Sequence, residues 1–171
     1  MAEVMLRQRV DDLGLDVRVA SAGRLESGLP ASDHGIEVLR GRGIDMVPHR
    51  SRRSTKDILL GADLVLGMAR EHVMDAVVAV PALFPRTFTL RELVRRGEAA
   101  GPRRQGESLD GWLARVGEGR THRDVLGASR DDDIADPIGG PRSAYERLAV
   151  ELDGLLDRLV AVAFAGALTA R

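Results

Sequence analysis

The sequence contains no cysteine in its 171 residues. That absence excludes disulfide bonds, thiolate metal sites and thiol nucleophiles within these residues. Aromatic residues make up only 3%, and the formal net charge at pH 7 is −1, which does not indicate a nucleic-acid-binding protein. The longest apolar run, Leu159 to Ala170, is too short to span a bilayer, and no secretory signal opens the chain. We therefore expect a cytoplasmic protein that does not enter a membrane.

The hydrophobic content of 44% and the charged content of 30% are typical of a globular protein, and the length suits one domain over residues 1–171. Apolar periodicity and capping residues predict helices over residues 1–10, 31–41, 57–60, 71–80, 90–96 and 143–168. The 57–60 helix would be capped by Ser54 or Thr55. Short extended runs predict strands over residues 16–23, 62–67 and 85–89. Strands that alternate with helices predict an α/β domain with a parallel sheet.

A segment rich in Gly, Arg and Asp runs from Gly97 to Asp133, with one predicted helix over Leu109 to Val116. We interpret the segment as a surface insertion, with a mobile lid as one alternative. Trp112 lies at helical spacing and is expected to anchor the packing. The run Asp131 to Asp133 is expected to be a solvated stretch of charge rather than a metal site, and no metal or cofactor is predicted.

The stretch Asp136-Pro-Ile-Gly-Gly140 combines the residue types of a tight, exposed turn. Pro137 fixes its own φ and holds Asp136 in an extended conformation, and the two glycines let the backbone bend sharply. Two interpretations of Asp136 remain open at this point. It is either an ordinary turn residue or a general acid held on a loop over an active site.

Four stretches occur in one order: Met1-Ala-Glu-Val-Met-Leu-Arg7, Ala20-Ser-Ala-Gly23, His49-Arg-Ser-Arg52 with Ala62-Asp-Leu-Val-Leu-Gly-Met68, and Asp136 to Gly140 with Tyr145. Together they resemble the low-molecular-weight protein tyrosine phosphatase family, whose fold is shared by thioredoxin-coupled arsenate reductases. The resemblance covers nearly the whole chain apart from residues 97–133. It implies a three-layer α/β/α fold around a small parallel sheet.

The resemblance also implies a mechanism. A phosphate-binding loop offers backbone N–H groups and an arginine to the phosphoryl oxygens, and a cysteine thiolate in that loop attacks phosphorus. A carboxylic acid protonates the leaving group and then activates water. By resemblance Asp136 is this acid/base, while Pro137, Ile138, Gly139 and Gly140 form the acid loop and the rim of the cleft. Two further positions, Ser21 and His49, match residues that support the phosphate-binding loop.

The sequence departs from the family at the nucleophile. Met1-Ala2-Glu3 aligns with the residues that follow the family's Cys-to-Arg-Ser-Pro loop, so that the cysteine, its arginine and the first strand would precede residue 1. One expectation is that Met1 is an internal residue of a longer natural protein. The other is a short protein that has lost its chemistry. In either case the chain as given is predicted to be inactive on phosphate esters.

The expected partner is a phosphorylated protein or a small aryl phosphate, and the sequence does not define the oligomeric state. Aromatic walls that would flank a phosphotyrosine are replaced by Arg24-Leu-Glu-Ser27 and by Ile138-Gly139. Phosphotyrosine, other aryl phosphates, phosphoarginine and arsenate therefore remain open as substrates. A different class of function is a pseudophosphatase that binds a partner protein. A nucleic-acid patch around Arg50, Arg52 and Arg53 is a third alternative, which the near-neutral net charge disfavours.

Overall fold

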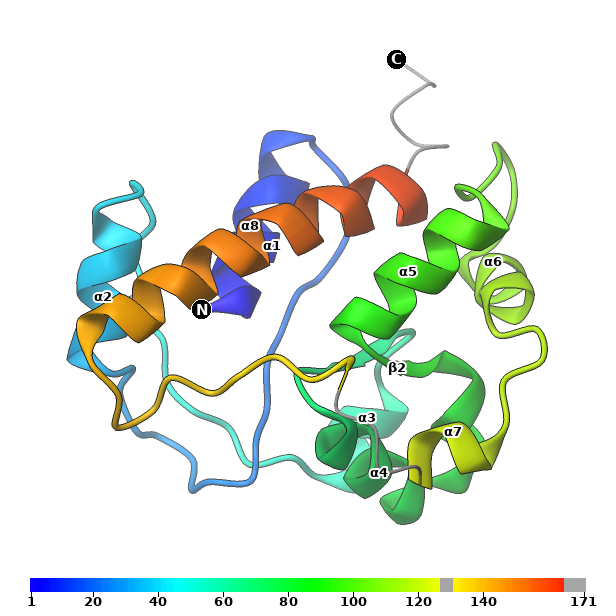
Figure 1. Cartoon of the computed structure of the whole chain (residues 1–171), viewed down its shortest axis with the longest axis horizontal. Helices are drawn as coiled ribbons and strands as arrows, with labels where there is room; N and C mark the ends of the chain where they lie inside the picture. The colour runs from blue at the N-terminus through cyan, green and yellow to red at the C-terminus, as the bar shows by residue number, and fades with distance from the viewer. Residues whose placement is uncertain (127–130, 165–171) are drawn as a thin grey trace. The chain divides into compact units, whose positions relative to one another are not determined.

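The computed structural model describes residues 1–126 and 131–164 (Figure 1). Its contacts divide the chain into two compact units. The first contains residues 1–54 and 136–157, and the second contains residues 55–135 together with the segment from residue 158. Helix α8 (Arg142–Ala163) contributes its first turns to the first unit and its last turns to the second. That the chain forms one domain stays a prediction.

The first unit is built on three helices, α1 (Ala2–Asp12), α2 (Asp33–Arg40) and the first turns of α8. Their apolar faces form its core, which contains Val4, Met5, Val10, Val38, Leu39, Met46, Tyr145, Ala149, Leu152, Leu155 and Leu156. Arg9 of α1 forms ion pairs with two carboxylates of α8, at 2.9 Å to Asp153 and 2.7 Å to Asp157. The ion pairs and the apolar contacts together fix α1 on α8.

The predicted strand over residues 16–23 does not form. Residues 15–22 carry no regular secondary structure, and Gly23 makes an isolated bridge to Arg53. The burial of residues 15–20 alternates as it would in a strand, with Val17 and Val19 half-buried between exposed neighbours. The local pattern is therefore extended, as Figure 1 also shows for the chain that follows α1. A strand additionally needs a neighbouring strand to pair with its backbone N–H and C=O groups, and no described segment forms such a pairing with residues 15–22.

Two loops of the first unit pair with each other. Residues 23–30 lie against residues 50–54 through isolated bridges between Gly23 and Arg53 and between Pro30 and Arg50. Ser51 is central to this pairing, because its N–H donates to the Leu29 carbonyl at 2.9 Å and its carbonyl accepts from Gly28 at 2.8 Å. The arginine-rich loop over residues 50–54 is thus held in place by a second loop.

The second unit contains a two-stranded parallel sheet formed by β1 (Val65–Gly67) and β2 (Thr87–Thr89). The connection between the strands carries helix α4 (Arg70–Ala79) and the 3-10 helix η1 (Pro81–Arg86). Every residue of β2 is buried, and its threonine hydroxyls are satisfied: Thr87 donates to Leu83 O, and Thr89 accepts from Glu92 N. The predicted α/β class is confirmed, although both strands are shorter than predicted. Residues 62–64 precede β1 without forming strand, and Pro85 and Arg86 belong to η1 rather than to β2.

Helices α3 (Lys56–Leu60), α5 (Leu90–Ala100), α6 (Leu109–Val116) and α7 (His122–Leu126) complete the second unit. Thr55 is the cap of α3, since its Oγ1 accepts from Ile58 N at 3.3 Å. The α6 prediction is confirmed residue for residue. Trp112 of α6 is fully buried and donates through Nε1 to Gly101 O at 3.1 Å, which confirms its predicted role as a packing anchor.

Gly97 of α5 allows the close approach of Trp112. A Cβ at this glycine would lie 3.0 Å from the Trp112 ring and 3.1 Å from the Val162 side chain. The first residues of the predicted insertion are therefore part of α5 and of the core. The long C-terminal helix is confirmed as α8 to Ala163, while residues 165–168 of the prediction lie outside the described residues.

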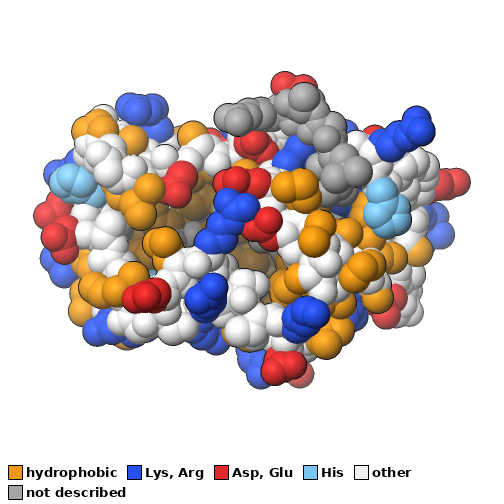
Figure 2. Space-filling view, turned by 90° about the horizontal axis from the view of Figure 1, so that it is seen from below, with side chains coloured by type: hydrophobic (Ala, Val, Ile, Leu, Met, Phe, Trp, Pro, Cys, Tyr) orange, Lys and Arg blue, Asp and Glu red, His pale blue; other side chains and the backbone are white. Residues whose placement is uncertain are grey.

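The surface seen in Figure 2 carries basic and acidic side chains interspersed with apolar ones, in keeping with a net charge of −1. Among the helices of residues 1–126 and 131–164, none combines the length and the apolar character that crossing a membrane requires.

Candidate active site

Asp136 lies at the start of a tight turn, as the sequence predicts. The side chain is exposed, and its Oδ1 accepts a hydrogen bond from the N–H of Ile138 at 2.9 Å. The turn closes where the Gly140 N–H donates to the Pro137 carbonyl at 2.8 Å, and α8 begins at Arg142. One carboxylate oxygen therefore holds the turn, while Oδ2 accepts no hydrogen bond from the described residues.

The two glycines of this turn serve different purposes. Gly139 has a φ of +72°, which side chains with a Cβ rarely adopt. At Gly140 a Cβ would lie 2.9 Å from the Pro137 carbonyl oxygen, a backbone atom that cannot rotate away. The sequence Asp-Pro-Ile-Gly-Gly thus fixes both the shape of the turn and the position of the Asp136 carboxylate.

Ser21 and His49, the two predicted supporting residues, meet at the carboxylate of Glu3 in the first turn of α1. Ser21 donates its hydroxyl to Glu3 Oε2, and His49 Nδ1 lies 3.4 Å from the same oxygen. Arg7 pairs with Glu3 Oε1 and also donates to the Val19 carbonyl at 3.0 Å. The Glu3 side chain is only 7% exposed, so that its charge is satisfied by these neighbours rather than by water. We call Glu3, Arg7, Ser21 and His49 the Glu3 cluster.

The pKa values of the cluster follow from its geometry. Burial disfavours the charged form of Glu3, but the Ser21 hydrogen bond and the charges of Arg7 and His49 outweigh it, so that the pKa of Glu3 lies below its usual value. Burial lowers the pKa of His49; Glu3 opposes this effect, while Arg52 and Arg7 reinforce it. At neutral pH Glu3 is therefore ionised and His49 is neutral.

The sequence did not single out Glu3 or Arg7. Their spacing of four residues on an amphipathic helix is typical of a solvent-exposed ion pair. Their buried role depends on contacts with residues 21 and 49, which no local pattern indicates. Asp136 belongs to the same unit as the Glu3 cluster, but no hydrogen bond or ion pair among the described residues joins its side chain to the cluster.

Two aspartates that precede the Asp136 turn are hydrogen-bonded, one to an arginine side chain and one to the start of a helix. Asp132 is buried and accepts from Arg95 Nη2 at 2.9 Å. Asp133 Oδ1 accepts from the N–H of Arg70 at 2.7 Å, at the start of α4. Among residues 1–126 and 131–164, no three His, Cys, Asp or Glu side chains are grouped in a way that could hold a metal ion.

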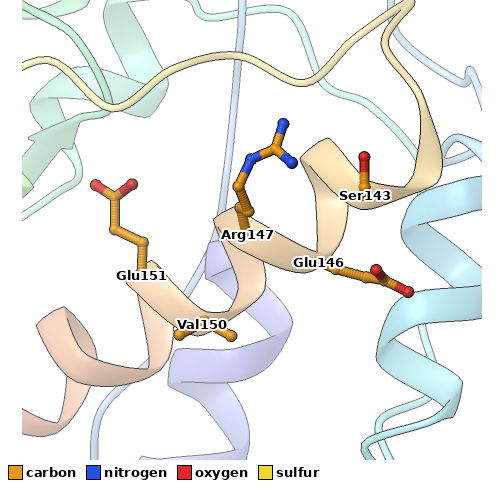
Figure 3. A pocket seen from close by; sticks show the side chains of 5 residues that line it. All are labelled: Ser143, Glu146, Arg147, Val150 and Glu151. Carbon is orange, nitrogen blue, oxygen red and sulfur yellow. The ribbon is translucent and has the colours of Figure 1, made fainter.

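A shallow hollow lies along α8 and is lined by Ser143, Glu146, Arg147, Val150 and Glu151 (Figure 3). Ser143, Arg147 and Glu151 project from the same side of the helix, as their spacing of four residues requires. The hollow contains none of the predicted site residues, and all its lining residues come from one helix. It is an open helix surface rather than a substrate cleft.

A family model, curated proteins and solved structures match this chain. The family model described as low molecular weight phosphotyrosine protein phosphatase matches residues 1–101. The protein-arginine-phosphatase of Geobacillus stearothermophilus is 31% identical over 144 residues, which are 84% of this chain and 74% of that protein. The structure of YwlE arginine phosphatase from the same organism is similar with a TM-score of 0.71 and 28% identity, covering 99% of this chain and 87% of that one.

A low molecular weight protein tyrosine phosphatase from T. tengcongensis has a similar structure, with a TM-score of 0.68 and 31% identity over 93% of this chain and 86% of that one. The family model spans more than half of the present sequence, and these structures share its α/β fold. The chain belongs to the low molecular weight phosphotyrosine protein phosphatase family.

Proposed function

We propose that this chain provides the general acid/base and the supporting residues of a protein phosphatase that works through a phosphocysteine. Asp136 is the acid/base, Ser21 and His49 support the phosphate-binding loop, and Pro137 to Gly140 form the rim of the cleft. The substrate is a phosphorylated protein, with phosphotyrosine or phosphoarginine as the phosphorylated residue. The names of the similar proteins include both an arginine phosphatase and a tyrosine phosphatase.

The observation that carries the proposal is the state of the Asp136 carboxylate. It is exposed, it is held in place by its own turn through Oδ1, and Oδ2 remains available for proton transfer. A general acid needs this combination of fixed position and access to the leaving group. An aspartate that merely stabilised the turn would need only the first feature.

The proposed reaction has two steps. A cysteine thiolate attacks phosphorus while the bond to the leaving oxygen or guanidino nitrogen breaks, and protonated Asp136 gives its proton to that leaving atom. The resulting Asp136 carboxylate then takes a proton from the water that attacks the phosphocysteine. Phosphate leaves and the thiolate is restored.

The Glu3 cluster supports the same proposal. Ser21 and His49 converge at the first turn of α1, the end of a helix whose free N–H groups favour a bound anion. By the family resemblance, this is where the phosphate-binding loop enters the helix. An ionised Glu3 then orients Ser21 and His49 toward that loop.

The thiolate is not among these residues, because the sequence has no cysteine. The 171-residue chain is therefore proposed to be inactive by itself. The test compares it with a second protein that carries a strand and a Cys-to-Arg-Ser-Pro loop ahead of residue 1. Turnover of para-nitrophenyl phosphate is expected only from the second protein.

Asp136→Asn tests the acid role in that second protein, since the amide oxygen still accepts the hydrogen bond from Ile138. With a poor leaving group such as phenol, we expect kcat/KM, which reports the transfer of the phosphoryl group to the cysteine, to fall by about 10²- to 10⁴-fold. The loss should be much smaller with para-nitrophenol, which needs little protonation to leave. Equal losses with both leaving groups would contradict the assignment.

The absence of cysteine also favours a second candidate function, a pseudophosphatase that binds phosphoproteins without turning them over. This candidate predicts no turnover by either protein. It also predicts that the 171-residue chain binds phosphoprotein by itself.

A further inference from the structure

Arginines are concentrated on the paired loops of the first unit. Residues 23–30 and 50–54 contain four arginines, Arg24, Arg50, Arg52 and Arg53, and a single carboxylate, Glu26. All four arginines are exposed. We call this surface the arginine rim. The local excess of positive charge contrasts with the net charge of −1 of the whole chain.

The arginine rim has a fixed backbone. Gly23 donates to the Arg52 carbonyl and accepts from the N–H of Ser54, each at 2.8 Å. The N–H of Arg53 donates to Ser27 Oγ at 2.9 Å. The arginines therefore project from a cross-braced pair of loops, which lowers the entropy lost when a partner binds.

The rim is connected to the Glu3 cluster. Arg52 donates through Nε to the carbonyl of Ser21 at 3.2 Å, and His49 directly precedes Arg50 in the chain. The charge of Arg52 also reaches His49, whose pKa it helps to lower. The rim therefore borders the residues that we propose to support the phosphate-binding loop.

We infer that the arginine rim binds acidic side chains that flank the phosphorylated residue of a protein substrate. The inference rests on the proposed phosphatase function for the phosphorylated residue itself. Guanidinium groups recognise carboxylates through charge-assisted, often bidentate hydrogen bonds. Leu25 and Leu29 of the same loops are 60% and 45% exposed, and they offer apolar contact to the peptide between its acidic residues.

An acidic peptide fits this surface better than a nucleic acid does. Neither loop segment contains an aromatic residue on which a base could stack, and aromatic residues are 3% of the whole sequence. A sugar–phosphate backbone also offers no apolar side chain for Leu25 and Leu29 to contact. The positive charge is also limited to four side chains, whereas binding to the backbone of a nucleic acid improves with every phosphate neutralised.

The test measures binding by the 171-residue chain, which needs no phosphate-binding loop. Three fluorescein-labelled peptides of twelve residues share a central tyrosine and the same apolar residues. Their flanking residues are glutamate, glutamine or lysine. In fluorescence anisotropy at 50 mM NaCl, we expect the glutamate peptide to bind about tenfold more tightly than the glutamine peptide, and the difference to shrink at 500 mM.

Arg53→Glu is the informative variant, because the Arg53 contact within the rim uses the backbone N–H and not the side chain. Arg53→Glu should remove most of the preference for the glutamate peptide, whereas Arg53→Lys, which keeps the positive charge, should retain it. Arg40→Glu, an exposed arginine of α2, makes the same charge change outside the rim and should leave the preference intact. Circular dichroism checks that each variant is folded.

Equal binding of the glutamate and glutamine peptides would overturn the inference. The inference would also be overturned if Arg53→Glu and Arg40→Glu reduced the preference for the glutamate peptide equally. Tighter binding of an oligothymidylate with the same charge as the glutamate peptide would overturn it too. These results are independent of catalysis. Suppose that the protein with the Cys-to-Arg-Ser-Pro loop failed to hydrolyse phosphate esters, while the 171-residue chain still preferred the glutamate peptide. Only the proposed function would then be contradicted.

Discussion

Glu3 illustrates how the environment of one residue decides its role. On a helix surface its pairing with Arg7 would contribute a few tenths of a kcal/mol. Here its carboxylate is nearly inaccessible and is shared by Ser21 and His49 as well. The loss of any one partner would leave a buried charge less compensated, so the four residues of the Glu3 cluster behave as one unit.

The lowered pKa of His49 predicts a pH dependence of stability. Below pH 6.5 the unfolded chain binds a proton at His49 before the folded chain does, so the free energy of unfolding falls as the pH falls below that value. Glu3 adds a second loss below its usual pKa of 4.5, for the same reason. We expect urea unfolding midpoints to drop between pH 7.5 and pH 5.5.

His49→Gln should reduce the drop in midpoint between these two pH values, because glutamine has no proton to gain. His34→Gln is the matched control, since His34 is exposed on α2 and distant in sequence from the Glu3 cluster. If the midpoint of the His49→Gln protein fell as steeply as that of the unaltered chain, the burial of His49 would not be responsible.

Gly140 allows a second prediction about single residues. Gly140→Ala places a Cβ 2.9 Å from the Pro137 carbonyl oxygen, and the turn must open to relieve the clash. We expect a loss of about 1–3 kcal/mol in the free energy of unfolding. Gly154→Ala in α8 is the control, because its Cβ would meet no atom within 4 Å and alanine stabilises a helix interior by about 0.5–1 kcal/mol. Chemical denaturation should show that Gly140→Ala lowers the free energy of unfolding and that Gly154→Ala raises it. Changes of the same sign in both proteins would contradict this prediction.

Helix α4 shows how one element depends on another that is distant in sequence. Its N-cap position is Ala69, which has no side-chain acceptor, and Asp133 provides the carboxylate instead. Asp133→Ala should cost about 1 kcal/mol, the usual value of an N-cap. Asp133→Asn keeps an acceptor oxygen and should cost less. Equal thermal denaturation midpoints for the unaltered chain and Asp133→Ala would show that solvent replaces this cap.

Arg120 joins the segment after α6 to the sheet. Its side chain is 2% exposed, and Nε donates to Glu92 at 2.8 Å, Nη1 to Phe84 O at 2.7 Å and Nη2 to Thr87 O at 2.6 Å. The guanidinium also lies over the rings of Phe84 and Phe88, at 4.5 and 4.1 Å. Every nitrogen of this buried cation is therefore hydrogen-bonded.

Arg120→Ala should destabilise the protein by about 3–5 kcal/mol, because it leaves the buried Glu92 carboxylate with one fewer cation and two carbonyls without a donor. Arg104→Ala, at an exposed arginine between α5 and α6, should cost under about 0.5 kcal/mol. Urea unfolding of the two variants provides the measurement. A small loss at Arg120 would mean that the segment is held by α6 alone.

Local signals predicted the described α-helices except α7, and they failed for one strand. Thr55 marks the start of α3, and the apolar periodicity of residues 109–116 marks α6. Each signal lies within a few residues of its helix, and both predictions are confirmed. Residues 16–20 have the alternating burial of a strand, but no described strand pairs with them. No property of the segment itself could reveal that missing neighbour. The 3-10 helix η1 was missed because Pro85 suits an extended chain equally well.

At the scale of the whole molecule, sequence alone identified the fold class and the family, because four short stretches in a fixed order carry them. It also located the turn at Asp136 to Gly140, whose Asp, Pro and Gly residues act within five positions. It could not locate the Glu3 cluster or the contact of Arg52 with Ser21, which join residues 18 to 46 positions apart in the sequence. The assignment of Asp136, Ser21 and His49 to a phosphatase mechanism stays a prediction.

The most direct test of the account is para-nitrophenyl phosphate turnover by two purified proteins side by side. One is the 171-residue chain, and the other carries a strand and a Cys-to-Arg-Ser-Pro loop ahead of residue 1. We predict turnover by the second protein alone, with a loss of kcat/KM in its Asp136→Asn variant that grows as the leaving group becomes more basic. Turnover by the 171-residue chain, or an unchanged rate in the Asp136→Asn variant with phenyl phosphate, would contradict it.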